Sequence, residues 1–198
     1  VKPVLRGKVF LIRYADDFVL VFSHEGDARR VYATLPKRMA KYGLTIHPEK
    51  TRLLTFRRPP LNAERSDEET FNFLGFTHHW ARSRRGAWIV KRTTSKDRLT
   101  RSLKRIWLWC SENRHDPIDE QHRQLCAKVR GHYNYFGVTG NARRLTEFSL
   151  QVHKAWRFWL NRRSQRASMP WKRFTQLLRR WPLPAARIVH SIFRTAAT

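Results

Sequence analysis

Short apolar runs separated by polar links dominate the first third of the chain. Residues 8–13 and 18–23 are rich in β-branched and aromatic side chains, and only four residues lie between them. Two strand-like runs around so short a link predict a β-hairpin. Residues 25–42 instead carry apolar side chains three and four positions apart, which predicts an amphipathic helix. Pro36 lies inside that pattern, so we expect a kink or an early break there, and Gly43 is placed to end the helix.

More strands are expected before the pattern changes. Residues 44–47 and 51–56 have the composition of strand pieces around a Pro-Glu-Lys turn. The polar, proline-containing stretch at 57–70 predicts a loop. Two further strands and the basic turn between them are predicted at 71–80, 88–92 and 82–87.

From Ser95 onward the apolar spacing is that of helices. Ser95 is a suitable N-cap for a first helix, and Asp116-Pro117 begins a second with proline at the first helical position. Asn141 is expected to cap a third helix, and a short fourth helix should end near Arg180. The side chains expected on the inner faces of the first three helices are Leu99, Leu103, Ile106, Trp107 and Cys110, then Leu125, Val129, Tyr133 and Phe136, then Leu145, Phe148, Val152, Trp156, Trp159 and Leu160.

The two patterns divide the chain near residue 94. Residues 1–94 mix strands with a helix, and residues 95–198 are helical. We therefore predict an α+β fold, in which an antiparallel sheet with a helix is followed by an all-α bundle.

Charge sharpens this picture. The 198 residues include 41 Lys or Arg and 15 Asp or Glu, a net charge of +26, and 16 of the basic residues but only one acid, Glu147, lie in residues 121–198. Such one-sided charge indicates a polyanionic partner, and phosphate contact is a better explanation than a solvated face, which usually mixes signs. The aromatic content of 13% argues against a disordered basic tail.

Several other classes of protein are excluded. No apolar stretch is long enough to span a membrane, and the first residues do not have the form of a secretory signal. The two cysteines are too few for a disulfide framework. We expect a cytoplasmic protein associated with nucleic acid, and residence in an organelle would also fit.

Asp16 and Asp17 are the candidate catalytic and metal-binding residues. They follow one apolar strand and precede another, and their carboxylates can converge only if the two residues lie in the turn. Paired carboxylates between strands suit Mg²⁺, which prefers oxygen ligands. Ordinary turn chemistry explains an Asp-Asp pair equally simply, because Asp is common in turns.

The surrounding motifs favour the metal site. Tyr14-Ala15-Asp16-Asp17 resembles the YxDD box of reverse transcriptases, and the order of the motifs that follow resembles the palm of group II intron-encoded members. Residues 129–136 are similar to the RGWxNYF signature of their thumb, which is also called maturase domain X. The other matching segments are Gly43-Leu44, residues 47–51 and residues 73–76.

The resemblance implies a role for each residue of the palm motifs. Asp16 would bind catalytic Mg²⁺, and Asp17 would complete the acidic turn. Tyr14 would pack against the primer end and Ala15 would lie under the incoming nucleotide. Lys50 would support the triphosphate, unless it is an ordinary surface lysine. The primer grip would be Leu74, Gly75 and Phe76, unless these form a plain core strand.

The helical half implies contact with RNA. Arginine and tryptophan alternate there, and cationic groups beside aromatic faces suit phosphates and stacked bases. For Trp156 and Trp159, which follow the apolar period, burial in the core is the favoured explanation. The residues predicted to bind RNA are Arg130, Arg143, Arg144, Arg157, Arg162, Arg163, Lys172, Arg173, Arg179 and Arg180.

The resemblance also implies that the site is incomplete. Family members carry another metal-binding Asp on an earlier palm strand, whereas none of the 15 residues before Asp16 is acidic. We expect the C-terminal part of an RNA-directed DNA polymerase and intron maturase, lacking fingers and the first palm carboxylate of its two-metal Mg²⁺ site. A separate N-terminal half or a homodimer would supply that group. The expected partners are intron RNA, an RNA template with a DNA primer, and dNTPs, with no membrane.

Two alternatives remain. A non-enzymatic maturase remnant would bind intron RNA and assist its folding. A general basic DNA-binding protein could carry the acidic turn by chance.

Overall fold

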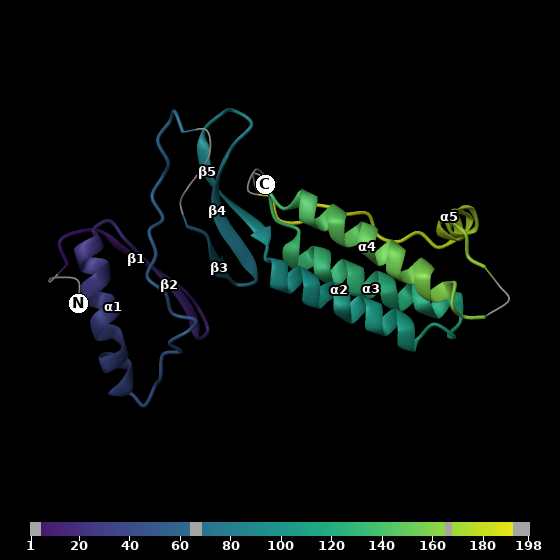
Figure 1. Ribbon diagram of the computed structural model, residues 1–198, viewed down its shortest axis with the longest axis horizontal. Coiled ribbons are helices and arrows are strands. Elements are labelled where there is room, and N and C mark those ends of the chain that lie inside the picture. Colours follow the sequence, from purple (N-terminus) through teal and green to yellow (C-terminus); the bar gives the residue numbers. More distant parts are fainter. Residues whose placement is uncertain (1–4, 64–68, 165–167, 192–198) are drawn as a thin grey trace, which may run out of the picture. The chain divides into compact units, whose positions relative to one another are not determined.

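The computed structural model describes residues 5–63, 69–164 and 168–191. It contains five helices and five strands, and the strands form two small antiparallel sheets, so the predicted α+β class is confirmed (Figure 1). The chain forms two compact units, Val1–Leu74 with Trp80–Trp88, and Gly75–His79 with Ile89–Thr198. The boundary predicted at residue 94 stays a prediction.

The first unit contains the predicted hairpin and helix. β1 (Val9–Tyr14) and β2 (Asp17–Phe22) pair antiparallel, and α1 (Glu25–Ala40) packs against β2. The helix is not broken at Pro36, so the early break is wrong. Gly43 has a φ of 68° just after the helix end, a conformation that glycine adopts without a Cβ penalty.

The strand pieces predicted at residues 44–47 and 51–56 are wrong. Neither segment is hydrogen-bonded to a neighbouring strand, and both are irregular in the structure. A short apolar run becomes a strand only when another backbone satisfies its N–H and C=O groups, and composition does not supply that partner. The described residues of the predicted 57–70 loop form no helix or strand, as expected.

A second sheet has the strand order β3-β4-β5. Its strands are β3 (Phe71–Phe73), β4 (Phe76–Arg82) and β5 (Trp88–Thr94). The single strand expected at residues 71–80 is therefore wrong, because a turn at Leu74 and Gly75 divides it in two.

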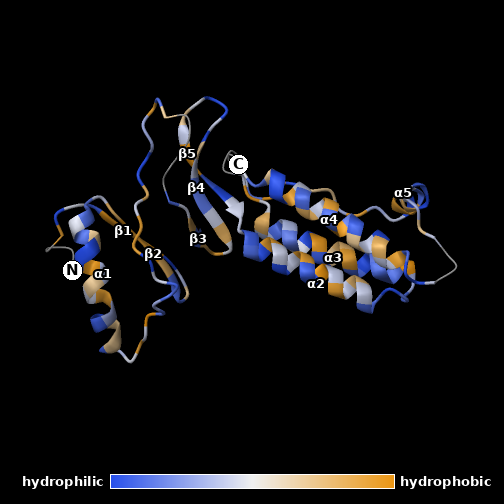
Figure 2. Cartoon of the chain, viewed as in Figure 1, coloured by the Kyte–Doolittle hydropathy of each residue, from blue (hydrophilic) through white to orange (hydrophobic). Residues whose placement is uncertain are grey.

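The second unit is organised around helices α2 (Lys96–Glu112), α3 (Ile118–Phe136) and α4 (Ala142–Leu160). Their apolar faces meet, with polar residues outside (Figure 2). The short α5 (Trp171–Arg180) inserts the fully buried ring of Phe174 into the same core. The buried core cluster consists of Phe76, Leu99, Ile106, Cys110, Leu125, Val129, Tyr133, Phe136, Val138, Leu145, Phe148, Val152, Ala155, Trp156, Leu160 and Phe174.

The predicted inner faces are confirmed with one exception. Trp156 is fully buried and Trp159 packs against the core, as expected. Trp107, in contrast, is 40% exposed. Successive residues of a helix are about 100° apart, so Ile106 and Trp107 cannot both face the centre, and Ile106 occupies it.

Helix starts differ in detail from the sequence predictions. Pro117 is the N-cap of α3 and not its first helical residue. Ser95 and Asn141 are N-caps whose side chains make no capping hydrogen bond. The Asn141 side chain instead accepts the Thr94 N–H at 2.9 Å through Oδ1 and donates to Thr94 Oγ1 at 2.7 Å, which joins α4 to the end of β5.

No helix in the described ranges is both long and apolar enough to cross a membrane.

Candidate active site and nucleic-acid interface

The acidic pair lies at the tip of the β1–β2 hairpin. Tyr14 is the last residue of β1 and Asp17 the first of β2, and the two form a cross-strand pair. Ala15 and Asp16 are therefore the two residues of the turn. Ala15 has a φ of 52°, and Asp16 does not have a positive φ, which is the pattern of a type II′ hairpin turn.

Both carboxylates are accessible. Asp16 and Asp17 are exposed, and so is Tyr14. Residues directly opposite one another in a hairpin point to the same face, so Tyr14 and Asp17 share a face of the sheet while Asp16 lies at the turn. The expectation that both carboxylates lie in the turn holds for Asp16, whereas Asp17 is already paired in β2.

Arg13 stabilises the turn from the strand side. Its Nε donates a hydrogen bond of 2.7 Å to the carbonyl of Ala15. The contact fixes the carbonyl of the strained residue and brings a guanidinium next to the acidic turn.

The start of the hairpin is held by a residue that the sequence did not reveal. Asp27 on α1 is 2% exposed, and its Oδ2 accepts the backbone N–H groups of Arg6 at 2.8 Å and Gly7 at 3.0 Å. A carboxylate with two backbone donors is a strong anchor. The only feature of the sequence that pointed to Asp27 was its place in the first turn of a helix. Acids are common there because they interact favourably with the helix dipole, whether or not they hold another segment.

Lys50 lies in an exposed turn next to α1. The backbone N–H of Thr51 donates to the carbonyl of His47 at 3.1 Å and closes the turn. The Tyr32 hydroxyl donates to the carbonyl of Thr51 at 3.3 Å and attaches the turn to α1. Lys50 itself is exposed, so its ammonium is available to a ligand.

Leu74 and Gly75 form the turn between β3 and β4. Their φ values are 50° and 77°, and two positive values in succession are typical of a type I′ turn. A Cβ on Gly75 would lie 3.3 Å from Cγ of Arg98, so glycine also permits the close approach of α2. Phe76 is buried against Phe136 at a ring distance of 5.3 Å. Phe76 is therefore a core residue, as the alternative to the primer grip predicted. Leu74 and Gly75 lie in the turn and form the accessible part of the predicted primer grip.

Ala15 and Leu74 share an unusual backbone. Among the described residues they are the two that are not glycine and have positive φ. Each is the first central residue of a two-residue turn, and each belongs to a motif that the sequence singled out. Such strain costs roughly 1–3 kcal/mol and concentrates at functional sites.

One family model matches part of the chain. Residues 2–78 match the family model described as reverse transcriptase (RNA-dependent DNA polymerase). The matched segment includes the acidic hairpin, α1, Lys50 and the turn at Leu74. No curated protein and no solved structure gave a match.

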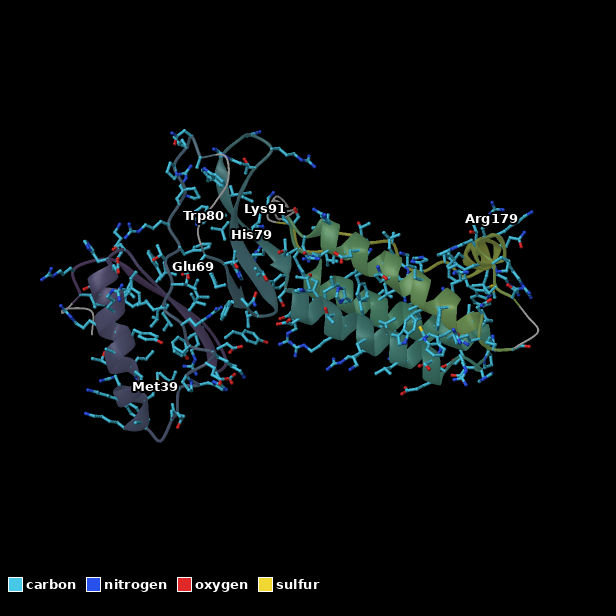
Figure 3. All side chains as sticks on the ribbon, viewed as in Figure 1. Met39, Glu69, His79, Trp80, Lys91 and Arg179 are labelled. Atoms are coloured by element: carbon cyan, nitrogen blue, oxygen red, sulfur yellow. The ribbon has the colours of Figure 1, made fainter. Side chains whose placement is uncertain are left out.

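The helical unit beyond the reverse transcriptase match carries the basic residues predicted to bind RNA. Seven of the ten are exposed: Arg130, Arg143, Arg162, Lys172, Arg173, Arg179 and Arg180. Four of these lie on α5, where Phe174 and the half-buried Leu177 and Leu178 hold the opposite side against the core, and Figure 3 shows Arg179 on this helix. The exposed face of α5 is thus cationic and firmly anchored.

The other three arginines make contacts within the protein. Arg144 forms an ion pair of 2.8 Å with Glu147. Arg157 donates to the carbonyl of Met169 at 3.0 Å and lies over the Trp171 ring. Nη2 of Arg163 donates to the carbonyls of His115 and Asp116, which connects the end of α4 to the α2–α3 turn.

The thumb-like motif at residues 129–136 alternates between core and surface. Val129, Tyr133 and Phe136 are buried, whereas Arg130 is exposed. His132 is also buried, and it stacks on Phe148 with ring centroids 3.6 Å apart. Burial lowers the pKa of His132 to about 4, so its ring is neutral at physiological pH.

Proposed function

We propose that this chain provides the acidic turn and the RNA-binding helices of an RNA-directed DNA polymerase. The same protein would act in the cytoplasm as the maturase of a group II intron. The observation that carries the proposal is the pair of exposed carboxylates at a strained two-residue turn, inside the segment that matches the reverse transcriptase family. The exposed cations of the helical unit support the RNA-binding part.

The turn fits Mg²⁺ by the chemistry of its donors. Mg²⁺ binds to one or two carboxylates and completes its coordination with water and substrate phosphates. Asp16 and Asp17 supply such carboxylates, and both are accessible to a nucleotide. The bound metal would neutralise developing charge on the phosphate during transfer.

The remaining residues of the proposed site bind and orient. Tyr14, which shares a face with Asp17, is positioned to pack against the primer end. Ala15 has a small side chain at the tip, where an incoming nucleotide would lie close to the backbone. The exposed ammonium of Lys50 would contact the triphosphate, a role suited to a compact cation.

No third acidic ligand joins Asp16 and Asp17 among the described residues. In the described ranges, no cluster of three or more His, Cys, Asp or Glu side chains could hold a metal. The resemblance to reverse transcriptases implies a further metal-binding carboxylate, from an earlier palm strand, in a two-metal site. The third carboxylate would therefore come from another segment.

The open edge of β1 is where such a segment would add. Among the strands of the described residues, β1 pairs with β2 alone. Phe10 is 62% exposed and Leu11 is 61% exposed, and because neighbouring strand residues point to opposite faces, both faces of β1 are bare. An unpaired apolar edge is a template for another strand. A separate N-terminal palm segment or a second copy would cover it.

The test is primer extension on an RNA template with Mg²⁺, using this chain with and without a supplied N-terminal palm segment. We expect extension only with the segment, and its loss in Asp16→Asn. Asp97→Asn, which removes an exposed acid from α2, serves as the control and should retain activity. Extension by this chain alone would contradict the inference of a missing carboxylate, and activity unaffected by Asp16→Asn would contradict the role of the turn.

The concentration of charge favours a second candidate function. Residues 121–198 hold 16 basic residues and one acid, which suits a protein that binds intron RNA without catalysis. RNA binding that survives Asp16→Asn with Asp17→Asn, together with no extension after complementation, would support this candidate over the enzyme.

A further inference from the structure

A groove between α2 and α4 is separate from every residue discussed for the proposed function. It encloses about 330 Å³, at the lower end of the usual size of ligand pockets. Its apolar floor is formed by Leu103, Ile106 and Ala155. The walls consist of Thr100, Lys104 and Trp107 from α2 and Gln151 and Lys154 from α4.

The polar side chains of this groove are available to a ligand. Thr100, Lys104, Gln151 and Lys154 are exposed. Within the part of the chain that the structure describes, none of the four has a hydrogen-bond or ion-pair partner for its side chain. The two lysines lie on opposite helices, and no carboxylate lines the groove. Its charge is therefore positive, with an amide that can both donate and accept hydrogen bonds.

Trp107 gives the groove a rigid aromatic wall. Its ring packs against Phe158 at 4.7 Å and against Trp159 at 5.4 Å, so its position is fixed by neighbours. It nevertheless remains 40% exposed. Beyond it, the guanidinium of Arg162 lies 4.4 Å from the centre of the Phe158 ring, which places another cation next to this aromatic pair.

We propose that this groove binds one unpaired nucleotide of an RNA strand. The base would enter the apolar groove and stack on Trp107, and Gln151 would hydrogen-bond to its edge. Lys104 and Lys154 would contact the phosphates on either side of the base. A planar apolar group flanked by anions is the ligand that an aromatic wall between two lysines fits, and stacking accepts any base because every base has a π face.

This site rests on the RNA-binding part of the proposed function, for which it names one place on the helices, and it does not depend on the carboxylates of the hairpin. Its test is therefore binding and not extension. The full chain would be titrated against two labelled RNA duplexes that differ only in one unpaired 2-aminopurine nucleotide. Anisotropy reports affinity, and quenching of 2-aminopurine reports stacking.

Two variants remove the groove by different means. Lys104→Gln with Lys154→Gln removes the cations without altering packing, and Trp107→Leu removes the stacking ring. We expect each to weaken binding of the RNA with the unpaired base about tenfold, and Trp107→Leu to abolish the quenching. Trp107→Phe should restore part of both, which separates loss of stacking from loss of folding.

The control removes the same charge elsewhere on the bundle. Lys96 and Lys128 are exposed and lie outside the groove, so Lys96→Gln with Lys128→Gln measures the general effect of two lost cations. Equal losses in the groove pair and the control pair would overturn the proposal. So would equal binding of an RNA whose unpaired nucleotide is abasic, since this would assign the groove to phosphate or to an acidic peptide. Equal quenching in a single-stranded DNA of the same sequence would overturn the restriction to RNA.

Discussion

Tyr14 and Asp17 form the last cross-strand pair of the β1–β2 hairpin, so only Ala15 and Asp16 remain to reverse the chain. This register forces Ala15 into a φ of 52°. The position of Asp16 at the tip thus depends on strain in its neighbour. In L-residues a left-handed backbone costs roughly 1–2 kcal/mol, because Cβ approaches the carbonyl oxygen.

We expect Ala15→Gly to relieve that strain. The free energy of unfolding of the hairpin should rise by about 0.5–1 kcal/mol, since the relief exceeds the entropy that glycine adds to the unfolded chain. Hydrogen exchange of the β1 and β2 amides would measure it. The same substitution at the exposed helical residue Ala33 should have the opposite sign and cost about 1 kcal/mol. A loss of stability in both variants would contradict strain at Ala15.

Outside the turn at Ala15 and Asp16, we expect substitution of Asp27 to lower the free energy of unfolding of the first unit more than any other substitution. In Asp27→Ala the backbone N–H groups of Arg6 and Gly7 lose their acceptor, and the cost should be about 2–3 kcal/mol because bonds to a charged group are strong. Hydrogen exchange across β1 and β2 is again the measurement, because it reports the local opening of these two strands.

Glu25→Ala is the matched control for Asp27. Glu25 is also an acid in the first turn of α1, but it is exposed, and its partners are the guanidinium groups of Arg29 at 2.7 Å and Arg57 at 3.7 Å. Its loss should cost at most about 1 kcal/mol, from the surface ion pair and the helix dipole together. Equal effects of the two substitutions would show that Asp27 acts only through the helix dipole.

The helices could be predicted from the sequence because their core positions repeat locally. Leu125, Val129 and Tyr133 are spaced so that each lies above the previous one, and all three are buried. The hairpin was equally local, since four residues separate its two apolar runs. Even here the period did not decide between Ile106 and Trp107, which compete for the same face.

The parts that could not be predicted depend on distant contacts or on backbone angles. Asp27 binds N–H groups about 20 residues earlier in the chain, and no local pattern announces that. The turn at Leu74 and Gly75 lies inside an apolar run, so its glycine suggested close approach to a ligand and not a reversal of the chain. Whether residues 44–56 found a strand partner was likewise not encoded in their composition.

Buried His132 should make the helical unit sensitive to mild acid. Its pKa is about 4 in the folded state, because burial disfavours the charged ring, and 6.5 is the ordinary value. The unfolded chain therefore binds a proton before the folded one. The contribution of neutral His132 to the free energy of unfolding is fully present above pH 6.5. It falls by at most about 3 kcal/mol as the pH decreases toward 4.

Urea unfolding from pH 7 to pH 4 measures this dependence. His132→Phe keeps an aromatic ring against Phe148 and should flatten the decline between pH 6.5 and pH 4.5. His115→Phe, at an exposed position, should leave the decline unchanged. A decline of the same size in all three proteins would show that His132 is solvated.

We expect only some arginines of the helical unit to contact nucleic acid phosphates. Arg179 and Arg180 are exposed at the end of α5, and no carboxylate of the described residues pairs with them, whereas Arg123 and Arg144 are paired with Glu120 and Glu147. A phosphate contact releases counterions, so each one lost reduces the slope of log affinity against log salt by about 1. Arg179→Gln with Arg180→Gln should therefore reduce the slope for RNA by about 2. Arg123→Gln with Arg144→Gln removes the same charge but should reduce it by much less, because those guanidinium groups are already neutralised. Equal reductions would mean that RNA senses only the net charge of the helical unit, and the anchored cationic face of α5 would then have no specific role in binding.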